Sequence, residues 1–283
     1  MSKLKFSRKL LAIPYGIFLV LYVIIPLVLI IIYAFTENVE SNPHFVYRGE
    51  GYRISFENAL SFFGNISNIN TFIVSIFTGF LNTVICLLIG YPIAYILAKK
   101  EYKFSFLVVI LFIMPMWINF VLRTSATREM FYGFKEITGI DITGAKYPFF
   151  ATMVGMVYNY LPFTILPLYS TMTKMNRSLI EASMDLGATP VQTFVKTIIP
   201  MTMPGIISAA NMVFMPTMSS FVISDVMGER QFALIGNIIQ TYFDQAMWHL
   251  GSFFALTMLV IILVSMFLTR NVEKEENARG GLW

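Results

Sequence analysis

The chain has 283 residues, of which 57% are hydrophobic and only 13% are charged. Soluble domains carry charge on about a quarter of their residues, so this composition excludes an ordinary soluble domain and predicts a protein of the lipid bilayer. The formal net charge of +4 comes from basic residues scattered through short segments, which argues against a nucleic-acid-binding surface.

Six uncharged runs are long enough to be membrane spans, for which about 20 residues are needed. The first run, 10–36, is too long for the apolar region of a signal peptide and no cleavage site follows it, so we expect a retained span. The polar segment 37–70 comes next, and its residues do not decide between a short strand and a helix. The later runs cover about 71–98, 104–122, 147–173, 202–224 and 250–269. This pattern predicts an all-α membrane protein with six transmembrane helices in one domain, 1–283.

The positions of the basic residues orient these spans. Four lysines and arginines precede the first span, and three each lie in 99–103, in 174–196 and in the C-terminal tail, against seven in the opposite loops. Cytoplasmic loops of membrane proteins carry the excess of positive charge. Both termini, and the segment 176–205, are therefore expected on the cytoplasmic side.

No Asp, Glu, Lys or Arg lies inside the six spans. Carriers driven by protons or sodium ions usually need an ionisable residue in the membrane, so the energy for transport should come from elsewhere. No G-x-x-x-x-G-K-[ST] motif occurs, which leaves any ATP to another chain. The single cysteine, Cys86, and two separated histidines, His44 and His249, form no metal-ligand pattern.

The segment 176–205 lies between the fourth and fifth spans and predicts two short helices. In the first helix, Ser178 followed by Glu181 indicates a capping box, and Gly187 occupies the position of a left-handed C-cap. The first helix should therefore end at a sharp turn that only a glycine adopts easily.

The second helix of the segment should begin afresh at Thr189. Pro190 suits the first helical position, and Gln192 completes a second capping box. Pro200 and Pro204 should limit how far this helix runs, because proline removes a backbone donor and crowds the preceding turn.

On a helical wheel, the first helix has two apolar faces and one charged stripe. The stripe holds Glu181 and Asp185, one apolar face holds Ile180 and Met184, and the other holds Leu179, Ala182, Ser183 and Leu186. One apolar face should pack on the protein, and the face of Ile180 and Met184 should meet a partner. A helix lying on lipid headgroups is the alternative, but such helices usually carry lysine and arginine on the polar face.

Three groups of residues in this segment follow one another at a characteristic spacing: Glu181-Ala182-Ser183, Gly187, and Ile198-Ile199-Pro200. The spacing resembles the EAA loop of permease subunits of binding-protein-dependent ABC importers, E-A-A, three residues, Gly, nine residues, I-x-L-P. The sequence departs from that pattern at Ser183, Thr197 and Ile199. In that family the loop docks in a cleft of the cytoplasmic ATPase, so we name residues 176–205 the coupling segment; an ordinary cytoplasmic helical hairpin is the alternative. The residues that the resemblance implies for ATPase coupling are Glu181, Ala182, Ser183, Asp185, Leu186, Gly187 and Pro200.

Four further stretches narrow the resemblance. They are residues 90–95, 115–119 with Arg123, 161–163 leading to 167–170, and 224–228 with 234–237. Over about 82–263 the chain looks like the first permease subunit of spermidine/putrescine importers. The resemblance implies a type I ABC importer permease in a bacterial inner membrane, moving polyamines by alternating access. Its implied partners are a second homologous permease in a heterodimer, two copies of a cytoplasmic ATPase, and an extracytoplasmic substrate-binding protein. The ATPase holds ATP and Mg, and no cofactor is expected in this chain.

Polar and aromatic residues near prolines are the candidates for substrate contact. Trp117 and Asn119 follow Pro115, Tyr158 precedes a second proline, and Asp225 lies at the expected outer mouth of the fifth span. Aromatic rings hold cations through contacts worth about 0.5–2 kcal/mol, which suits a flexible polyamine that must be released. An aromatic belt at the membrane interface would explain the rings equally well.

Two other functions compete with polyamine import. In the first, the same architecture serves an anion or a sugar, and Arg123 near the path would bind the substrate. A membrane enzyme would need a nucleophile with a base, or a pair of metals, and the spans contain no His or carboxylate for this.

Overall fold

The computed structural model describes residues 13–38, 52–99 and 105–280; residues 10–12 and 104 of the predicted spans, and His44, lie outside this part of the chain. Two compact units are present, one comprising 1–69 and 238–260 and the other 70–237 and 261–283. Within the described residues, five helices are long and apolar enough to cross a membrane, or six if one sharply bent pair is a single span. The predicted all-α membrane fold is confirmed.

The first unit begins with a continuous apolar helix that contains a π-helical turn. Its parts are α1 (Ile13–Leu19), η2 (Val20–Ile24) and α2 (Ile25–Ala34). The segment 37–70, which the sequence left undecided, supplies both kinds of element. They are β1 (Thr36–Asn38), which pairs antiparallel with β2 (Tyr52–Ile54), then α3 (Glu57–Gly64) and the start of α4 (Ile66–Ala98).

Aromatic side chains form the centre of the first unit. The first turn of α13 (Trp248–Gly280) places the His249 ring 5.2 Å from the Tyr33 ring, and His249 Nδ1 lies 3.1 Å from both the Tyr33 carbonyl oxygen and Thr36 Oγ1. Phe62 of α3 packs edge-on against Phe254, with ring centroids 4.8 Å apart. These contacts join the end of α2, α3 and the start of α13.

The second unit holds most of the remaining elements. They are most of α4, then α5 (Ser105–Ile113), η3 (Met114–Trp117), α6 (Phe120–Thr138), α7 (Pro148–Thr173), α8 (Arg177–Asp185), α9 (Pro190–Thr193), η4 (Phe194–Ile198), α10 (Ile199–Ser219), α11 (Val222–Met227), the start of α12 (Ile235–Asp244) and most of α13. Its buried core comprises Cys86, Ala151, Met156, Tyr160, Val213, Ile223, Met227 and Leu234.

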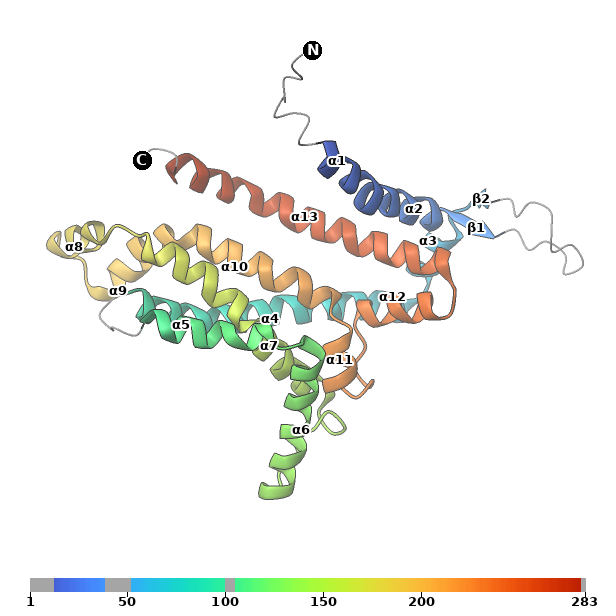
Figure 1. Cartoon of the computed structure of the whole chain (residues 1–283), viewed down its shortest axis with the longest axis horizontal. Coiled ribbons are helices and arrows are strands. Elements are labelled where there is room, and N and C mark those ends of the chain that lie inside the picture. Colours follow the sequence, from blue (N-terminus) through green and yellow to red (C-terminus); the bar gives the residue numbers. More distant parts are fainter. Residues whose placement is uncertain (1–12, 39–51, 100–104, 281–283) are drawn as a thin grey trace, which may run out of the picture. The chain divides into compact units, whose positions relative to one another are not determined.

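Small residues let the long helices of this unit approach closely. Helices α4, α7 and α10 lie side by side (Figure 1). A Cβ added at Gly205 would lie 2.7 Å from Thr171 Oγ1, and one at Gly90 would lie 2.9 Å from Thr164 Cγ2. Membrane helices associate through close packing of this kind, because lipid tails provide little hydrophobic drive.

The third predicted span, 104–122, is not one helix. α5 and the 3-10 turn η3 end at Trp117, and α6 then leaves at a bend of 99° (Figure 1). Pro115 lies in the 3-10 turn, and Asn119 caps the new helix by accepting hydrogen bonds from the Val121 and Leu122 backbone amides at 2.9 and 3.3 Å. The cap gives the chain a fresh helix start, so α6 continues to Thr138, past the predicted end.

Candidate functional site

The N-cap of α8, the first helix of the coupling segment, lies two residues before the predicted N-cap. Asn176, and not Ser178, is the N-cap, and its side-chain oxygen accepts hydrogen bonds from Ser178 N at 3.1 Å and Ser178 Oγ at 2.8 Å. The predicted Ser178–Glu181 capping box is therefore wrong. Asparagine and serine are about equally good N-caps, so the earlier of the two takes the role here and Ser178 lies inside the helix.

The turn after α8 follows the prediction. Gly187 has φ of +86°, the left-handed conformation expected of a C-cap glycine. Ala188 N donates to Ser183 O at 3.2 Å and Gly187 N donates to Met184 O at 2.9 Å, the two bonds of a Schellman motif. The second capping box is also present: Thr189 Oγ1 accepts from Gln192 N, and Gln192 Oε1 accepts from Thr189 N.

The second helix does not stop at the prolines, so the prediction that Pro200 and Pro204 limit it is wrong. Residues Pro190–Ser219 form one continuous helix through α9, η4 and α10, which also starts well before the predicted fifth span, 202–224. The π-helical turn η4 changes the backbone hydrogen-bond pattern immediately before Pro200, where an ordinary helix would lose a donor.

Two departures from the EAA pattern contact one another. The Ser183 hydroxyl lies 3.3 Å from Thr193 Oγ1 and accepts a hydrogen bond from Thr197 Oγ1 at 3.3 Å. Ser183 of α8 is thereby tied to α9 and η4. Where the pattern has two apolar residues, this chain fastens its two helices with hydroxyl groups.

The structure allocates the faces of α8 differently from the wheel. Ile180 and Met184, expected to meet a partner, line a pocket beside the helix together with Glu181, and Met184 is 46% exposed. The most exposed apolar side chain is Leu186, at 89%, and Leu179 on the same predicted face is also exposed. Glu181, Ala182 and Asp185 are exposed, as are Gly187 and Pro200. The exposed surface of α8 and its C-cap therefore includes Leu179, Glu181, Met184, Asp185 and Leu186.

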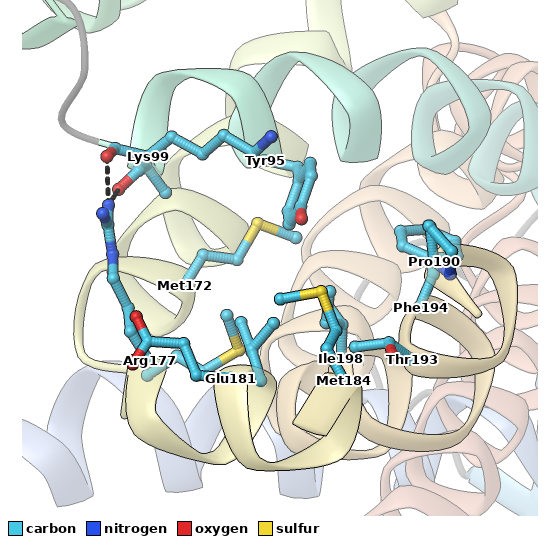
Figure 2. Close-up of a pocket in the computed structure, with 13 residues that line it drawn as sticks. Tyr95, Lys99, Met172, Arg177, Glu181, Met184, Pro190, Thr193, Phe194 and Ile198 are labelled. Atoms are coloured by element: carbon cyan, nitrogen blue, oxygen red, sulfur yellow. Dashed lines mark hydrogen bonds between the residues drawn. The ribbon is translucent and has the colours of Figure 1, made fainter. Parts of the chain in front are cut away.

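The pocket behind α8 has a volume of about 490 Å³ and is shown in Figure 2. Tyr95 and Lys99 at the end of α4 line one side, opposite Glu181 and Met184 of α8. The Arg177 guanidinium donates to the backbone carbonyls of Ala98, at 3.2 Å, and Lys99. This contact ties the first residue of α8 to the end of α4.

The candidate substrate-path residues divide between two places. Trp117, 82% exposed, and Asn119, the cap of α6, lie at the 99° bend. One turn further on, Arg123 lies with its guanidinium 5.6 Å from the Tyr158 ring centroid. Tyr158 of α7 is 44% exposed, and the start of α6 brings a guanidinium to one face of this ring.

Arg123 is 7% exposed and is oriented by Asn159. Its Nε donates to Asn159 Oδ1 at 2.8 Å, and the Asn159 amide in turn donates to Thr124 Oγ1 at 3.3 Å and to the Gly155 carbonyl at 2.8 Å. Arg123 is thus engaged by neutral oxygen atoms of α7.

Asp225 belongs to a different network. It lies in the first turn of α11, and Asn237 Nδ2 donates to its Oδ1 at 2.5 Å. Asn237 belongs to the stretch 234–237, for which the sequence predicts no role in the site. Its spacing of twelve residues from Asp225 gave no geometric signal, because only the closed loop brings the two side chains together.

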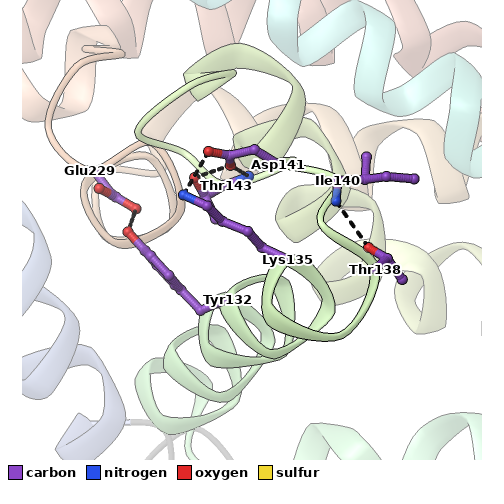
Figure 3. A network of polar contacts seen from close by, with 7 residues as sticks. All are labelled: Tyr132, Lys135, Thr138, Ile140, Asp141, Thr143 and Glu229. Atoms are coloured by element: carbon purple, nitrogen blue, oxygen red, sulfur yellow. Dashed lines mark hydrogen bonds and ion pairs between the residues drawn. The ribbon is translucent and has the colours of Figure 1, made fainter.

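A polar network fastens α6 to the loops beside α11 (Figure 3). The Tyr132 hydroxyl donates to Glu229 Oε1 at 2.5 Å, and Lys135 Nζ lies 2.7 Å from Asp141 Oδ2. The hydrogen bond from Lys135, with those from Thr143, holds the pKa of Asp141 well below its usual value. Tyr132 and Lys135 therefore hold the later part of α6 against the loops that carry Glu229 and Asp141.

The chain was compared with known proteins. Residues 90–276 match the family described as "Binding-protein-dependent transport system inner membrane component". The Spermidine/putrescine transport system permease protein PotB of Haemophilus influenzae is 32% identical over 285 residues, covering 97% of this chain and 96% of that protein. The PotB protein of Escherichia coli is 38% identical over 189 residues, 64% of this chain and 69% of that protein.

Solved structures of low sequence identity share the fold. A bacterial ABC transporter involved in the import of the acidic polysaccharide alginate contains a chain with a TM-score of 0.64, 14% identity and 94% coverage of both chains. The MetNI methionine ABC transporter matches with a TM-score of 0.52 and 20% identity, over 71% of this chain and 92% of that one. Since the family match covers most of the sequence and a relative above 30% identity matches nearly all of it, the chain belongs to the inner membrane components of binding-protein-dependent transport systems.

Proposed function

We propose that this chain is a permease subunit of an ATP-driven importer that moves spermidine and putrescine into a bacterial cell. The observation that carries the proposal is the similarity to proteins named as spermidine/putrescine permeases, which extends over nearly the full length of one of them. The transport role follows from the family; the polyamine is what the relatives' names add.

The proposed complex contains a second, homologous permease subunit, two copies of a cytoplasmic ATPase that bind ATP and Mg, and an extracytoplasmic binding protein. Residues 1–283 form one transmembrane domain in the inner membrane with both termini in the cytoplasm, as the distribution of basic residues supports. This chain needs no cofactor of its own in the proposal, because hydrolysis takes place on the ATPase.

The coupling segment is the proposed contact with the ATPase. The exposed surface of α8, with Glu181, Asp185, Leu186 and neighbouring Ala182, would enter the cleft of the ATPase. Gly187 would set the angle between α8 and α9, and Ser183 and Pro200 would support the helices from behind. The exposed Leu186 supports this arrangement, since a large apolar side chain on a cytoplasmic turn is stabilised by a partner surface.

The proposed substrate path uses Trp117, Asn119, Tyr158 and Asp225. A polyamine carries several ammonium groups, and these bind aromatic faces and carboxylates. Asp225 would receive the cation from the binding protein, and the rings would hold it by weak contacts that permit release.

The test is uptake by the reconstituted complex in proteoliposomes. We expect ATP-dependent initial rates of spermidine and putrescine uptake that require this chain, and no transport by this chain alone. ATP-dependent uptake of a sugar or an anion without polyamine uptake would refute the substrate assignment. Uptake by a complex containing two copies of this chain and no second permease would refute the heterodimer.

Asp225 provides a more specific test of the path. Asp225→Asn should lower uptake mainly at low spermidine concentration, and the loss should shrink as salt screens the attraction of the wild-type carboxylate. Asp244→Asn is the matched control, because it removes an exposed carboxylate from the loop expected on the same side of the membrane. Equal rates for wild type and Asp225→Asn at every salt concentration would remove Asp225 from the path.

A further inference from the structure

A buried amide lies at the centre of the contacts around Asp225. Asn237 is 8% exposed. Its Nδ2 donates to the Phe221 carbonyl at 3.1 Å and to Asp225 Oδ1 at 2.5 Å, and its Oδ1 accepts from Ser224 Oγ at 2.7 Å and from Leu234 N at 2.8 Å. The Asn237 side chain therefore connects three residues, the N-cap Phe221 and Ser224 and Asp225 of α11, to Leu234, the residue before α12.

These partners fix the orientation of the amide. Leu234 N can only donate and the Phe221 carbonyl can only accept, so the oxygen of Asn237 faces Leu234 and the nitrogen faces Asp225. An asparagine amide has two donor hydrogens and an oxygen that accepts two bonds, and all four are used here. A carboxylate at this position would keep the two accepted bonds and lose both donated ones.

Two glycines allow the loop to close around this amide. A Cβ at Gly236 would lie 2.6 Å from the Ser219 carbonyl oxygen, and one at Gly228 would lie 2.6 Å from the Ser224 carbonyl oxygen. The backbone thus approaches the end of α10 at Gly236, and α11 at Gly228, too closely for any larger residue. The stretches 224–228 and 234–237, which the sequence presents as separate motifs, form one locally closed structure.

The amide orients the Asp225 carboxylate without neutralising it. A lysine or arginine partner would fix the carboxylate and also cancel its charge, whereas the neutral Asn237 leaves the negative charge available to a cation. Asp225 is only partly buried, so that charge remains accessible. We infer that Asn237 is a positioning residue that holds the Asp225 carboxylate for the ammonium groups of the substrate. The inference rests on the proposed function and adds a second residue to it.

The test exchanges the donor of Asn237 for a carboxylate. Asn237→Asp keeps the oxygen that accepts from Ser224 and Leu234 but places a negative group against Asp225 Oδ1. Gln231→Glu is the control, since it adds the same charge to an exposed position of the same loop. The measurement is the initial rate of spermidine uptake by the reconstituted complex over a range of concentrations, which separates KM from the maximal rate.

We expect Asn237→Asp to raise KM about tenfold or more, because a hydrogen bond to a charged group is lost, and to change the maximal rate less. Gln231→Glu should leave KM within about twofold. The double variant Asp225→Asn with Asn237→Asp exchanges the two groups and restores a hydrogen bond between them. Its complex should assemble like wild type but keep a raised KM, because its carboxylate now occupies the buried position.

Two results would overturn the inference. One is a wild-type KM for an assembled Asn237→Asp complex. The other is a wild-type KM for the double variant. That result would show that the hydrogen bond between the two side chains is sufficient and that the position of the carboxylate does not matter. If Asn237→Asp does not assemble, Ser224→Ala removes one bond that orients the amide, and an unchanged KM would count equally against the inference. Failure of the wild-type complex to transport spermidine would instead refute the proposed function.

Discussion

Substitution of Gly187 tests the coupling segment most directly, because its cost arises from the backbone alone. A Cβ at Gly187 would meet no atom within 4 Å, so a larger side chain causes no clash. The φ of +86° is the source of the penalty, since a residue with a Cβ pays about 1–2 kcal/mol in the left-handed region. That energy lowers the equilibrium constant for forming the Schellman turn by a factor of roughly 5 to 30.

We therefore predict that Gly187→Val redirects α9 relative to α8 and weakens ATPase docking. Gly187→Ala should have a smaller effect than Gly187→Val, and Gly187→Asn a smaller one still, because asparagine adopts this conformation most readily. The assay is the amount of ATPase that co-purifies with the permease pair, followed by substrate-stimulated ATP hydrolysis in proteoliposomes.

Gly139 supplies a matched control for this series. It also has a positive φ, +73°, and a Cβ there would also meet nothing within 4 Å, but it caps α6 and lies outside the coupling segment. Gly139→Val should carry a similar backbone penalty without loss of ATPase binding. A Gly187→Val complex with wild-type ATPase binding and wild-type stimulated hydrolysis would refute the docking role of the turn.

Three further predictions concern the path, the packing and the outer network. Trp117→Ala should reduce the maximal rate of spermidine uptake, and Trp117→Phe should retain much of it because a weaker aromatic face remains; equal rates for both variants and wild type would exclude a ring contact. Gly205→Ala should lower the unfolding temperature in detergent, and Thr171→Ala should restore part of it by removing Thr171 Oγ1 and Cγ2, two of the three atoms that the new Cβ would meet; no recovery would contradict the packing. Asp141→Asn should reduce thermal stability at neutral pH. Because the folded-state pKa of Asp141 is lowered, the stabilisation by the carboxylate should begin to decrease when the pH drops below about 4, the ordinary aspartate pKa, and should disappear only as the pH passes the lowered pKa. A difference between the two proteins that persists unchanged at low pH would point to another cause.

The sequence predicted those parts of the coupling segment that depend on one residue's conformational preference. Gly187 and the Thr189–Gln192 box were found as expected, because a left-handed C-cap and a capping box are local. The predicted N-cap of α8 was wrong because asparagine and serine are about equally good N-caps. Residue preference alone therefore does not choose between Asn176 and Ser178.

Three other features were less accessible from the sequence. The run 104–122 is uncharged throughout, so its composition does not reveal that Asn119 caps a new helix after a 99° bend. Pro200 and Pro204 indicated a helix end, but the π-helical turn before them absorbs the disruption. Asp225 was selected for its charge, whereas Asn237 became visible only when the loop between them closed.

The unbroken helix Pro190–Ser219 has a mechanical consequence. At 1.5 Å per residue its 30 residues extend for about 45 Å, so a tilt of about 5° at one end displaces the other by about 4 Å. Its far end carries Thr217, whose hydroxyl accepts a hydrogen bond from the buried Asn82 at 2.8 Å, a contact that such a displacement would break. A tilt imposed at the capping box of the coupling segment would therefore be transmitted along the helix to the buried contact between Asn82 and Thr217.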